Sequence, residues 1–387
     1  DSALGAVNNT AVTGTIAIGQ SALTALTSGA GNTAVGYKAG LALTSGSSNT
    51  VVGYESLYTD DLGFGTTAIG YRACYYQNSD DTNEDTGNTA VGYAAMHVNV
   101  DGQFNTAVGY QSLYTMEPSG DNTGHNTGLG FKAGKFVSTG IDNTFVGASA
   151  GLGLGSGDQL TGSNNTAVGK DAGKLLQEAA SYNTLFGSSS GDAITEGSYN
   201  TCIGYNTDAA ATVGNQIAIG HTTTTTVADC IAIGNNFTNT TTRTVMFGDG
   251  GATMISLDWD TSGDSTWTRS SDRRRKRNIK DNTLGLDFIN KLRTRTFQMK
   301  PQNELPKEWV NYNETNRYDT EKVHIGFIAQ ELKELIDEYN APNEVASWSE
   351  DDDGMQRAGE TKLITPLIKA VQELSAQVEE LKEQLEN

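Results

Sequence analysis

The sequence predicts a mainly β protein in which a long shaft of parallel β-roll or β-helix type precedes a smaller α+β domain. Three observations lead to this prediction. A five-residue pattern, Asn-Thr-x-(Val/Ile/Leu/Phe)-Gly, returns at short and nearly constant spacing. The pattern stops near Gly250, and a cluster of basic residues follows soon afterwards. Finally, the chain ends in a heptad pattern of Ile, Val and Leu.

The repeats come first in the chain. The stretch "NTAVGY" at residues 32–37 recurs without change at 88–93 and at 105–110. A fixed short period with occasional insertions is typical of a repeat architecture, in which the insertions form loops. The commonest spacing between the repeat glycines is 17 residues, some spacings are 21 or 22, and the last two are 14. These glycines are Gly19, Gly36, Gly53, Gly70, Gly92, Gly109, Gly130, Gly147, Gly169, Gly187, Gly204, Gly220, Gly234 and Gly248.

Each repeat predicts one very short strand followed by a turn. Ile16 and Ile18 alternate with Ala17, so we expect the two isoleucines on the inner face and Ala17 on the other. The glycine after them permits a backbone conformation that a side chain would resist. One such strand cannot bury enough apolar surface, so the coils must stack on one another. The wider insertions, 77–87 and 116–125, are candidates for recognition loops.

Composition and charge exclude several classes of function. The 387 residues include 45 glycines and have a net charge of −20, which disfavours binding to nucleic acid or to an acidic membrane. Cys74, Cys202 and Cys230 have neither a disulfide nor a zinc spacing. No apolar run approaches the ~18 residues that span a bilayer. We therefore expect no membrane insertion, no metal and no cofactor.

The repeats resemble two related groups of proteins. The final units "IAIGHTTTTTVADC" and "IAIGNNFTNTTTRT" are similar to the left-handed β-roll of trimeric autotransporter adhesin heads, and "NTAVGYKAG" is similar to repeats in bacteriophage tail fibres. This resemblance spans residues 15–248 and implies a homotrimer. An aromatic residue follows many repeat glycines and predicts a stripe along the shaft, which suits either sugar contacts or a packing ladder. The weak receptor-binding candidates in this stripe are Tyr37, Tyr54, Tyr93 and Tyr110.

A basic segment, "SSDRRRKRNIK" at residues 270–280, follows the shaft. A serine needs a base to become a nucleophile, and a lysine with a lowered pKa can serve as that base. Ser271 and Lys276 are therefore candidates, and the neighbouring arginines would help to lower the pKa of the lysine. Spacing alone does not distinguish this pair from two surface residues.

The same segment resembles the start of the endosialidase-type intramolecular chaperone family, whose pattern is Ser-Asp-x-Arg-x-Lys-x-Asn-Ile. "HIGFIAQEL" from His324 and "LITPLIKAVQEL" from Leu363 resemble two later motifs of that family, in the expected order. The resemblance implies that Ser271 is the nucleophile of self-cleavage, that Lys276 is its base and that His324 supports them. The cut would fall beside Ser271, among Ser270, Ser271 and Asp272. Arg275 stands where the family usually has Leu.

The last part of the chain completes the predicted organisation. A helix from about Phe327 should place Ile328, Leu332, Leu335 and Ile336 in a core. The polar segments 301–322 and 341–362 resemble arms that grip the shaft. Residues spaced by three and four from Ile364 to Leu385 predict a coiled coil, for which the residue types favour a dimer and the resemblances a trimer. The predicted regions are a shaft at 1–248, a connection at 249–268, a chaperone and autoprotease domain at 269–362, and a coiled coil at 363–387.

The function implied by these resemblances is that of a phage tail fibre or tailspike fragment. It would attach to a host surface glycan or protein, form a homotrimer, and release its C-terminal chaperone by Ser-Lys self-cleavage. Its expected location is the virion tail, after assembly in the host cytoplasm. The alternatives are a trimeric bacterial surface adhesin, which should end in membrane strands, and a tailspike that degrades glycans.

Overall fold

The computed structural model describes residues 12–79, 85–116, 124–155, 157–250, 252–258, 267–268, 273–307, 309, 312–317, 319–341, 348–350 and 354–386. The chain divides into two compact units, Asp1–Ser271 and Asp272–Asn387. Within the described residues, no helix is long and apolar enough to cross a membrane.

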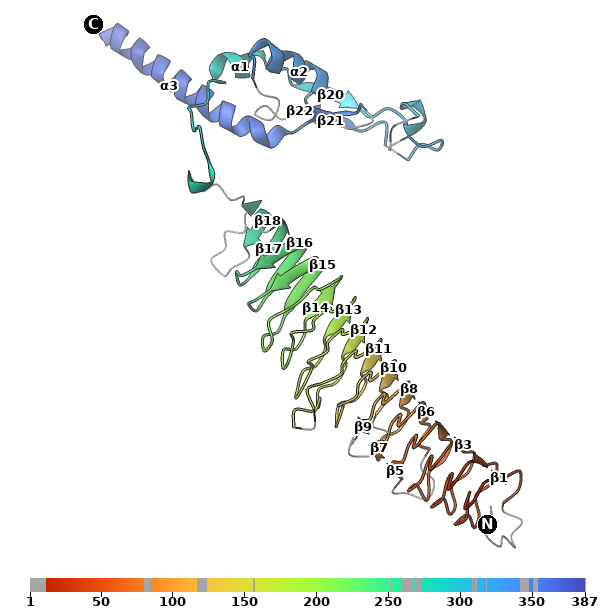
Figure 1. Ribbon diagram of the computed structural model, residues 1–387. Coiled ribbons are helices and arrows are strands. Elements are labelled where there is room, and N and C mark those ends of the chain that lie inside the picture. Colours follow the sequence, from red (N-terminus) through yellow and green to blue (C-terminus); the bar gives the residue numbers. More distant parts are fainter. Residues whose placement is uncertain are drawn as a thin grey trace. The chain divides into compact units, whose positions relative to one another are not determined.

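The first unit is a β-solenoid, in which one strand from each coil joins a single long sheet (Figure 1). Neighbouring strands are parallel and in register, so that Thr33 pairs with Thr50 and Val35 with Val52. The mainly β fold of repeats is thereby confirmed. The eleven three-residue strands of this sheet are β1 (Ile16–Ile18), β2 (Thr33–Val35), β3 (Thr50–Val52), β4 (Thr67–Ile69), β6 (Thr89–Val91), β8 (Thr106–Val108), β10 (Thr127–Leu129), β11 (Thr144–Val146), β12 (Thr166–Val168), β13 (Thr184–Phe186) and β14 (Thr201–Ile203).

The strands lengthen toward the end of the solenoid. There the parallel strands β15 (Gln216–Thr225), β16 (Cys230–Asn239) and β17 (Thr244–Asp249) follow. The antiparallel strands β18 (Ala252–Asp258) and β19 (Trp267–Thr268) then close this end of the sheet. A second small parallel sheet lies along one side of the solenoid and contains β5 (Tyr76–Asn78), β7 (Val98–Val100) and β9 (Thr115–Met116) (Figure 1).

The inner face of the strands differs from the prediction. The middle residue of each strand points inward, and Val51 and Ala107 are fully buried. Ile16 and Ile18 face outward and are 52% and 59% exposed. The prediction that the isoleucines form the inner face is therefore wrong for the single chain. The physical reason is that the residue before the strand, usually Asn, also lies inside, and a strand places alternate residues on the same face.

The buried asparagines form a hydrogen-bonded column with one interruption. The backbone N–H of Asn105 donates to Oδ1 of Asn88 at 2.9 Å, and that of Asn126 donates to Oδ1 of Asn105 at 2.9 Å. Nδ2 of Asn126 donates to the carbonyl of Gly140 at 2.9 Å. Since a buried polar group without a partner is costly, the column lets an interior of small side chains tolerate a row of amides. Thr66 interrupts it, although its N–H still donates to Asn49 Oδ1.

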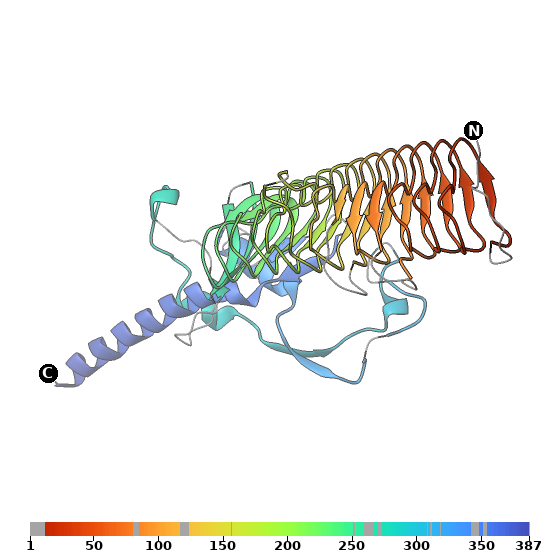
Figure 2. The same cartoon turned by 90° about the horizontal axis from the view of Figure 1, so that it is seen from below.

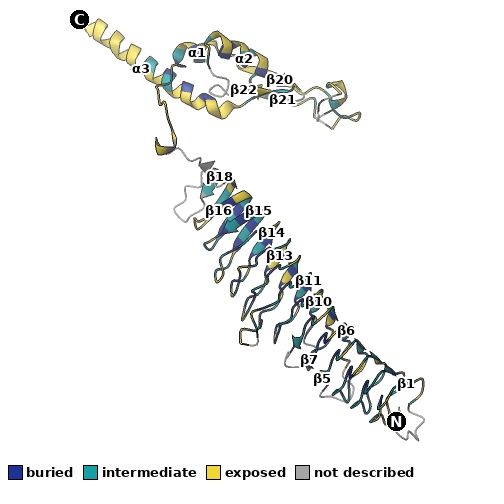
Figure 3. Ribbon diagram, viewed as in Figure 1, coloured by how far each residue is buried: buried dark blue, intermediate teal, exposed yellow. Residues whose placement is uncertain are grey.

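The second unit has its own small hydrophobic core (Figure 3). Its helices are α1 (Leu286–Lys291), α2 (Ala329–Glu338) and α3 (Ile364–Glu386), with 3-10 turns η1 (Arg273–Arg275), η2 (Gln302–Glu304) and η3 (Glu360–Leu363). Antiparallel pairs join β20 (Arg295–Gln298) to β21 (Val323–Gly326) and β22 (Trp348–Glu350) to β23 (Gln356–Ala358). The buried residues that form the core are Leu284, Phe288, Leu332, Leu335, Ile336 and Leu363.

Two predictions for this unit can be compared with the structure. The core face of the helix is confirmed for Leu332, Leu335 and Ile336, although α2 begins at Ala329. The segment 341–362 is more regular than predicted, because it contains β22, β23 and most of η3. In α3, Pro366 and Ala370 are buried, whereas the predicted coiled-coil residues lie exposed along the helix. The coiled coil therefore stays a prediction.

Candidate functional site

The predicted cleavage residues Ser270, Ser271 and Asp272 lie outside the described residues. What the structure describes is the segment that follows them. The turn η1 leads into an extended stretch, and the backbone N–H of Lys276 donates to the carbonyl of Arg273 at 3.1 Å. The side chains of Lys276 and Arg277 are exposed. The side chain of the candidate base is therefore accessible to solvent in the single chain.

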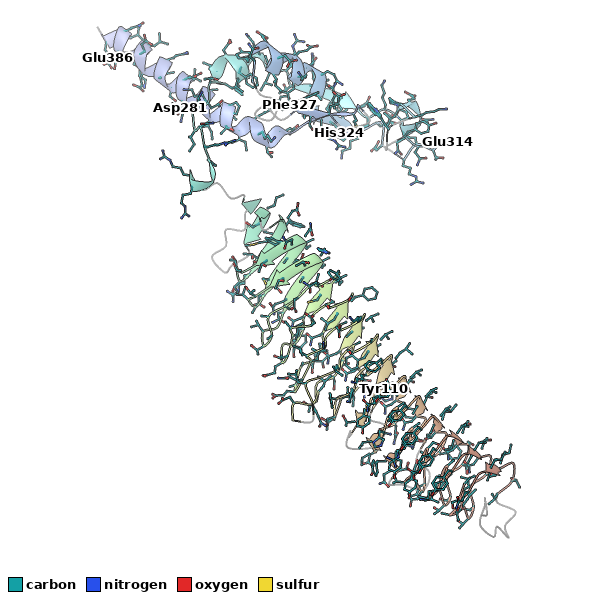
Figure 4. All side chains as sticks on the ribbon, in the orientation of Figure 1. Tyr110, Asp281, Glu314, His324, Phe327 and Glu386 are labelled. Atoms are coloured by element: carbon teal, nitrogen blue, oxygen red, sulfur yellow. The ribbon has the colours of Figure 1, made fainter. Side chains whose placement is uncertain are left out.

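The residues after Lys276 are also exposed. Asn278 has a φ of 54°, a left-handed conformation that Asn adopts more readily than most residues. Ile279 is 58% exposed, and Leu284 is the first residue of this stretch to enter a core. The segment 273–281, which we call the basic segment, thus presents an apolar side chain and several cations on its surface. Figure 4 places Asp281 on the stretch that approaches α1.

His324 lies on β21 rather than beside the basic segment. It pairs across the strands with Phe297 on β20, and the two rings stack with centroids 5.7 Å apart. The imidazole is partly buried. Phe327 follows the same strand, and both residues are marked in Figure 4. Among the described residues, no contact joins His324 to Lys276, so its supporting role stays a prediction.

A shallow cavity of about 450 Å³ lies beside α2 and contains none of the predicted site residues. Its walls include Glu331, Glu334 and Glu338, but two of these carboxylates already have partners. Arg295 pairs with Glu331, and Lys291 lies 2.9 Å from Glu338. Hydrogen bonding to Arg295 lowers the pKa of Glu331, so the pair is charged near neutral pH. These contacts join α2 to α1 and β20. The charged residues at the cavity are therefore explained by the packing of these elements.

The predicted aromatic stripe is a stacked ladder on the outside of the solenoid. Centroid distances are 5.0 Å for Tyr37–Tyr54, 5.0 Å for Tyr71–Tyr93 and 5.1 Å for Tyr93–Tyr110. Each ring covers the face of the next. A tyrosine between two other rings therefore exposes mostly its ring edge and its hydroxyl group. Tyr110 lies on the outside of the shaft in Figure 4. Binding of a receptor by Tyr37, Tyr54, Tyr93 and Tyr110 stays a prediction.

Sequence reasoning missed a second ladder that runs beside the first. It contains Tyr58, Tyr75, His97 and Tyr114, with centroids 4.8, 5.4 and 4.9 Å apart. The spacings of 17 and 22 residues could have revealed it. The predicted recognition loops 77–87 and 116–125 lie partly outside the described residues, at 80–84 and 117–123. No group of three or more His, Cys, Asp or Glu side chains among the described residues could hold a metal ion.

Comparison with known families gives one match. Residues 271–341, less than a fifth of the chain, match the family described as chaperone of endosialidase. The match assigns an intramolecular chaperone domain of the autoproteolytic serine peptidase type to the C-terminal part. Together with the repeat solenoid, it makes the chain similar to tail fibres that have such a domain. No curated protein and no solved structure matches the chain.

Proposed function

We propose that this chain is a phage tail fibre or tailspike fragment that folds as a homotrimer and then releases its C-terminal chaperone by cutting itself beside Ser271. The observation that supports it best is a coincidence of boundaries. The family match begins at residue 271, and the first compact unit ends at Ser271. A cut there would separate a complete solenoid from a complete second unit, since β19 ends at Thr268.

The chemistry needs only groups of this chain. Lys276 as a neutral amine takes the proton of the Ser271 hydroxyl, and the oxygen attacks a neighbouring backbone carbonyl. Attack on the carbonyl of Ser270 breaks the Ser270–Ser271 peptide bond and forms an ester, with the proton passing to the freed amine. Water then hydrolyses the ester.

Assembly would supply what the single chain lacks. Lys276 and Ile279 are exposed in one chain, and a lysine acts as a base at neutral pH only when its environment lowers its pKa. Burial of the basic segment by other copies would provide that environment, so cleavage would follow assembly. The outward apolar residues of the strands, such as Ile18 and Phe186, and the exposed apolar face of α3 offer surfaces for a trimer.

Attachment to a host surface glycan or protein is the remaining part of the proposal, with the virion tail as location. The support is the architecture: a rigid repeat scaffold with insertions resembles a binding fibre. The test is adsorption of the purified fibre to a panel of bacterial cells. Adsorption to some strains and not others is the expected result, and adsorption to none would contradict attachment.

Self-cleavage has a direct test with matched controls. Ser271→Ala should abolish the cut, and Lys276→Gln should slow it about 10²- to 10⁴-fold, the usual contribution of a general base. Ser265→Ala and Lys280→Gln change the same residue types nearby and should cut like the wild type. Denaturing gels and intact mass locate the bond. Full-length wild-type chains in a verified trimer, or cutting by Ser271→Ala, would contradict the dyad.

A further inference from the structure

The two aromatic ladders end in neighbouring coils. Phe131 is the last ring of the first ladder and stacks on Tyr110 at 5.4 Å, and Ala148 occupies the next position. Tyr114 ends the second ladder, and Lys135 follows it. Because the next coil has Ala148 and Ser149 in place of large side chains, the outer face of Phe131 has no further ring on it. Phe131 is 49% exposed.

Two lysines lie at this end of the ladders. Lys132 Nζ is 4.8 Å from the centroid of Phe131, and Lys135 Nζ is 4.7 Å from that of Phe136 and 5.5 Å from that of Tyr114. Aromatic faces attract cations, so both ammonium groups are held beside the rings at the ends of the two ladders. Burial and the charge of Lys132 together lower the pKa of Lys135. An anion placed between the two lysines would relieve their repulsion.

These lysines differ from three other cations of the described shaft, Arg72, Lys170 and Lys174. Arg72 pairs with Glu55 at 2.8 Å, and Lys170 and Lys174 each lie 3.5 Å from Asp171. Within the described residues, neither Lys132 nor Lys135 has a carboxylate partner. The unit 1–271 has 8 basic and 23 acidic residues, a net charge of −15. Two neighbouring lysines without an acidic partner are therefore unusual in this unit.

Backbone hydrogen bonds fix the positions of Phe131, Lys132 and Lys135. The N–H of Lys132 donates to the carbonyl of Tyr110 at 2.8 Å, and Lys135 accepts from the N–H of Thr115 at 3.2 Å and its hydroxyl at 3.1 Å. On the other side, the N–H of Ser149 donates to the carbonyl of Phe131 at 2.8 Å. Coils on both sides therefore hold the two lysines and the ring, which reduces the ordering cost of binding.

We propose that Phe131, Lys132 and Lys135 form a binding site for a carboxylate-bearing sugar of an acidic polysaccharide. The two ammonium groups would bind the carboxylate through charge-assisted hydrogen bonds, and the exposed ring would pack against the apolar face of the sugar. This inference rests on the proposed attachment function and gives it a location and a ligand class. The charge complementarity selects an anionic glycan over a neutral one.

The test measures binding of the full-length chain to polygalacturonate and to its fully methyl-esterified form, which has the same sugar without the charge. The double variant Lys132→Gln/Lys135→Gln should bind polygalacturonate at least about tenfold more weakly, as expected for lost hydrogen bonds to a charged group. Phe131→Ala should also weaken binding. Lys38→Gln is the matched control, because Lys38 lies over Tyr37 but Leu41 occupies the position equivalent to Lys135, and it should bind like the wild type.

Several results would overturn the site. One is equal binding by the wild type and the double variant, and another is equal binding of the methyl ester. Equal binding of polyglutamate, with no effect of Phe131→Ala, would indicate charge attraction without sugar recognition. Adsorption to cells separates this failure from that of attachment: a fibre that adsorbs to bacteria but ignores polygalacturonate refutes only this site. A fibre that adsorbs to no cells but binds polygalacturonate through these residues refutes only attachment.

Discussion

Asp208 shows how one residue couples the shaft to pH. Its carboxylate accepts the N–H of Ala209 at 2.9 Å and lies near Asp192 in the neighbouring coil. Burial, reinforced by the charge of Asp192, raises its pKa to about 6. A carboxyl group whose pKa is raised on folding is protonated more readily in the folded state. It therefore stabilises the fold at pH values below its unfolded pKa, near 3.8, and this stabilisation is lost as the pH rises through 6.

The prediction is that Asp208→Asn stabilises the shaft at pH 7.5. The amide is neutral and can still accept the backbone N–H, so the cost of a buried charge disappears. A shift of two pKa units corresponds to about 3 kcal/mol at most, and partial exposure reduces this. Thermal unfolding followed by circular dichroism from pH 7.5 to 4 measures the difference. The advantage of the variant should shrink as the pH falls below 6, and a constant or growing advantage would contradict this assignment.

At the scale of elements, the turn after each strand depends on a column of glycines. Gly109 has a φ of 134°, and a methyl group at its Cα would overlap the carbonyl oxygen of Gly130 in the next coil. A backbone carbonyl cannot move aside as a flexible side chain can. The repeat glycines from Gly19 to Gly234 are therefore required both by their conformation and by the close approach of the coils.

We predict that Gly109→Ala destabilises the shaft by at least about 1–3 kcal/mol, the usual cost of a residue held in an unfavourable backbone region. Gly157→Ala is the control, because nothing lies within 4 Å of its added methyl and no left-handed φ constrains it. Thermal melting of the two variants beside the wild type provides the measurement. Equal melting temperatures for Gly109→Ala and Gly157→Ala would show that the column is not tight.

The sequence predicts an element well when a short stretch of residues determines that element, and poorly when contacts between distant residues determine it. The repeat glycines and the strands at Thr33–Val35 and its equivalents follow from a short pattern, and both are present. The direction of the strand face was mispredicted, because hydrophobicity favours the isoleucines whereas the asparagine column determines which side is inside. Propensity does not reveal hydrogen bonds between residues 17 positions apart.

The two candidate sites differ in the same way: one is a short sequence motif, and the other depends on contacts between coils. The motif from Ser271 to Ile279 was found through its resemblance to the chaperone family, because spacing alone does not distinguish Ser271 and Lys276 from surface residues. The family match begins at the same serine. The lysine pair at the ladder ends was not found. Its distinguishing features are the missing carboxylate partners and the small Ala148 in the next coil, and both depend on how coils stack.

At the scale of the whole molecule, nearly identical repeats create a problem of register. Slippage of one chain by a 17-residue unit would match almost the same side chains, since strands with similar faces specify their register weakly. A C-terminal module that associates first would align the chains before the shaft forms. Once that module leaves, the durability of the shaft would depend on its unfolding barrier rather than on equilibrium.

The central claim is that assembly precedes the cut, and native mass spectrometry during refolding of the full-length chain tests it most directly. Each chain has a mass of 41.0 kDa, so uncut monomer, uncut trimer and cut trimer have different masses. The account predicts that uncut trimer appears first and that cut chains arise only within trimers, with no cut monomer at any time. Accumulation of cut monomer before any trimer would contradict it.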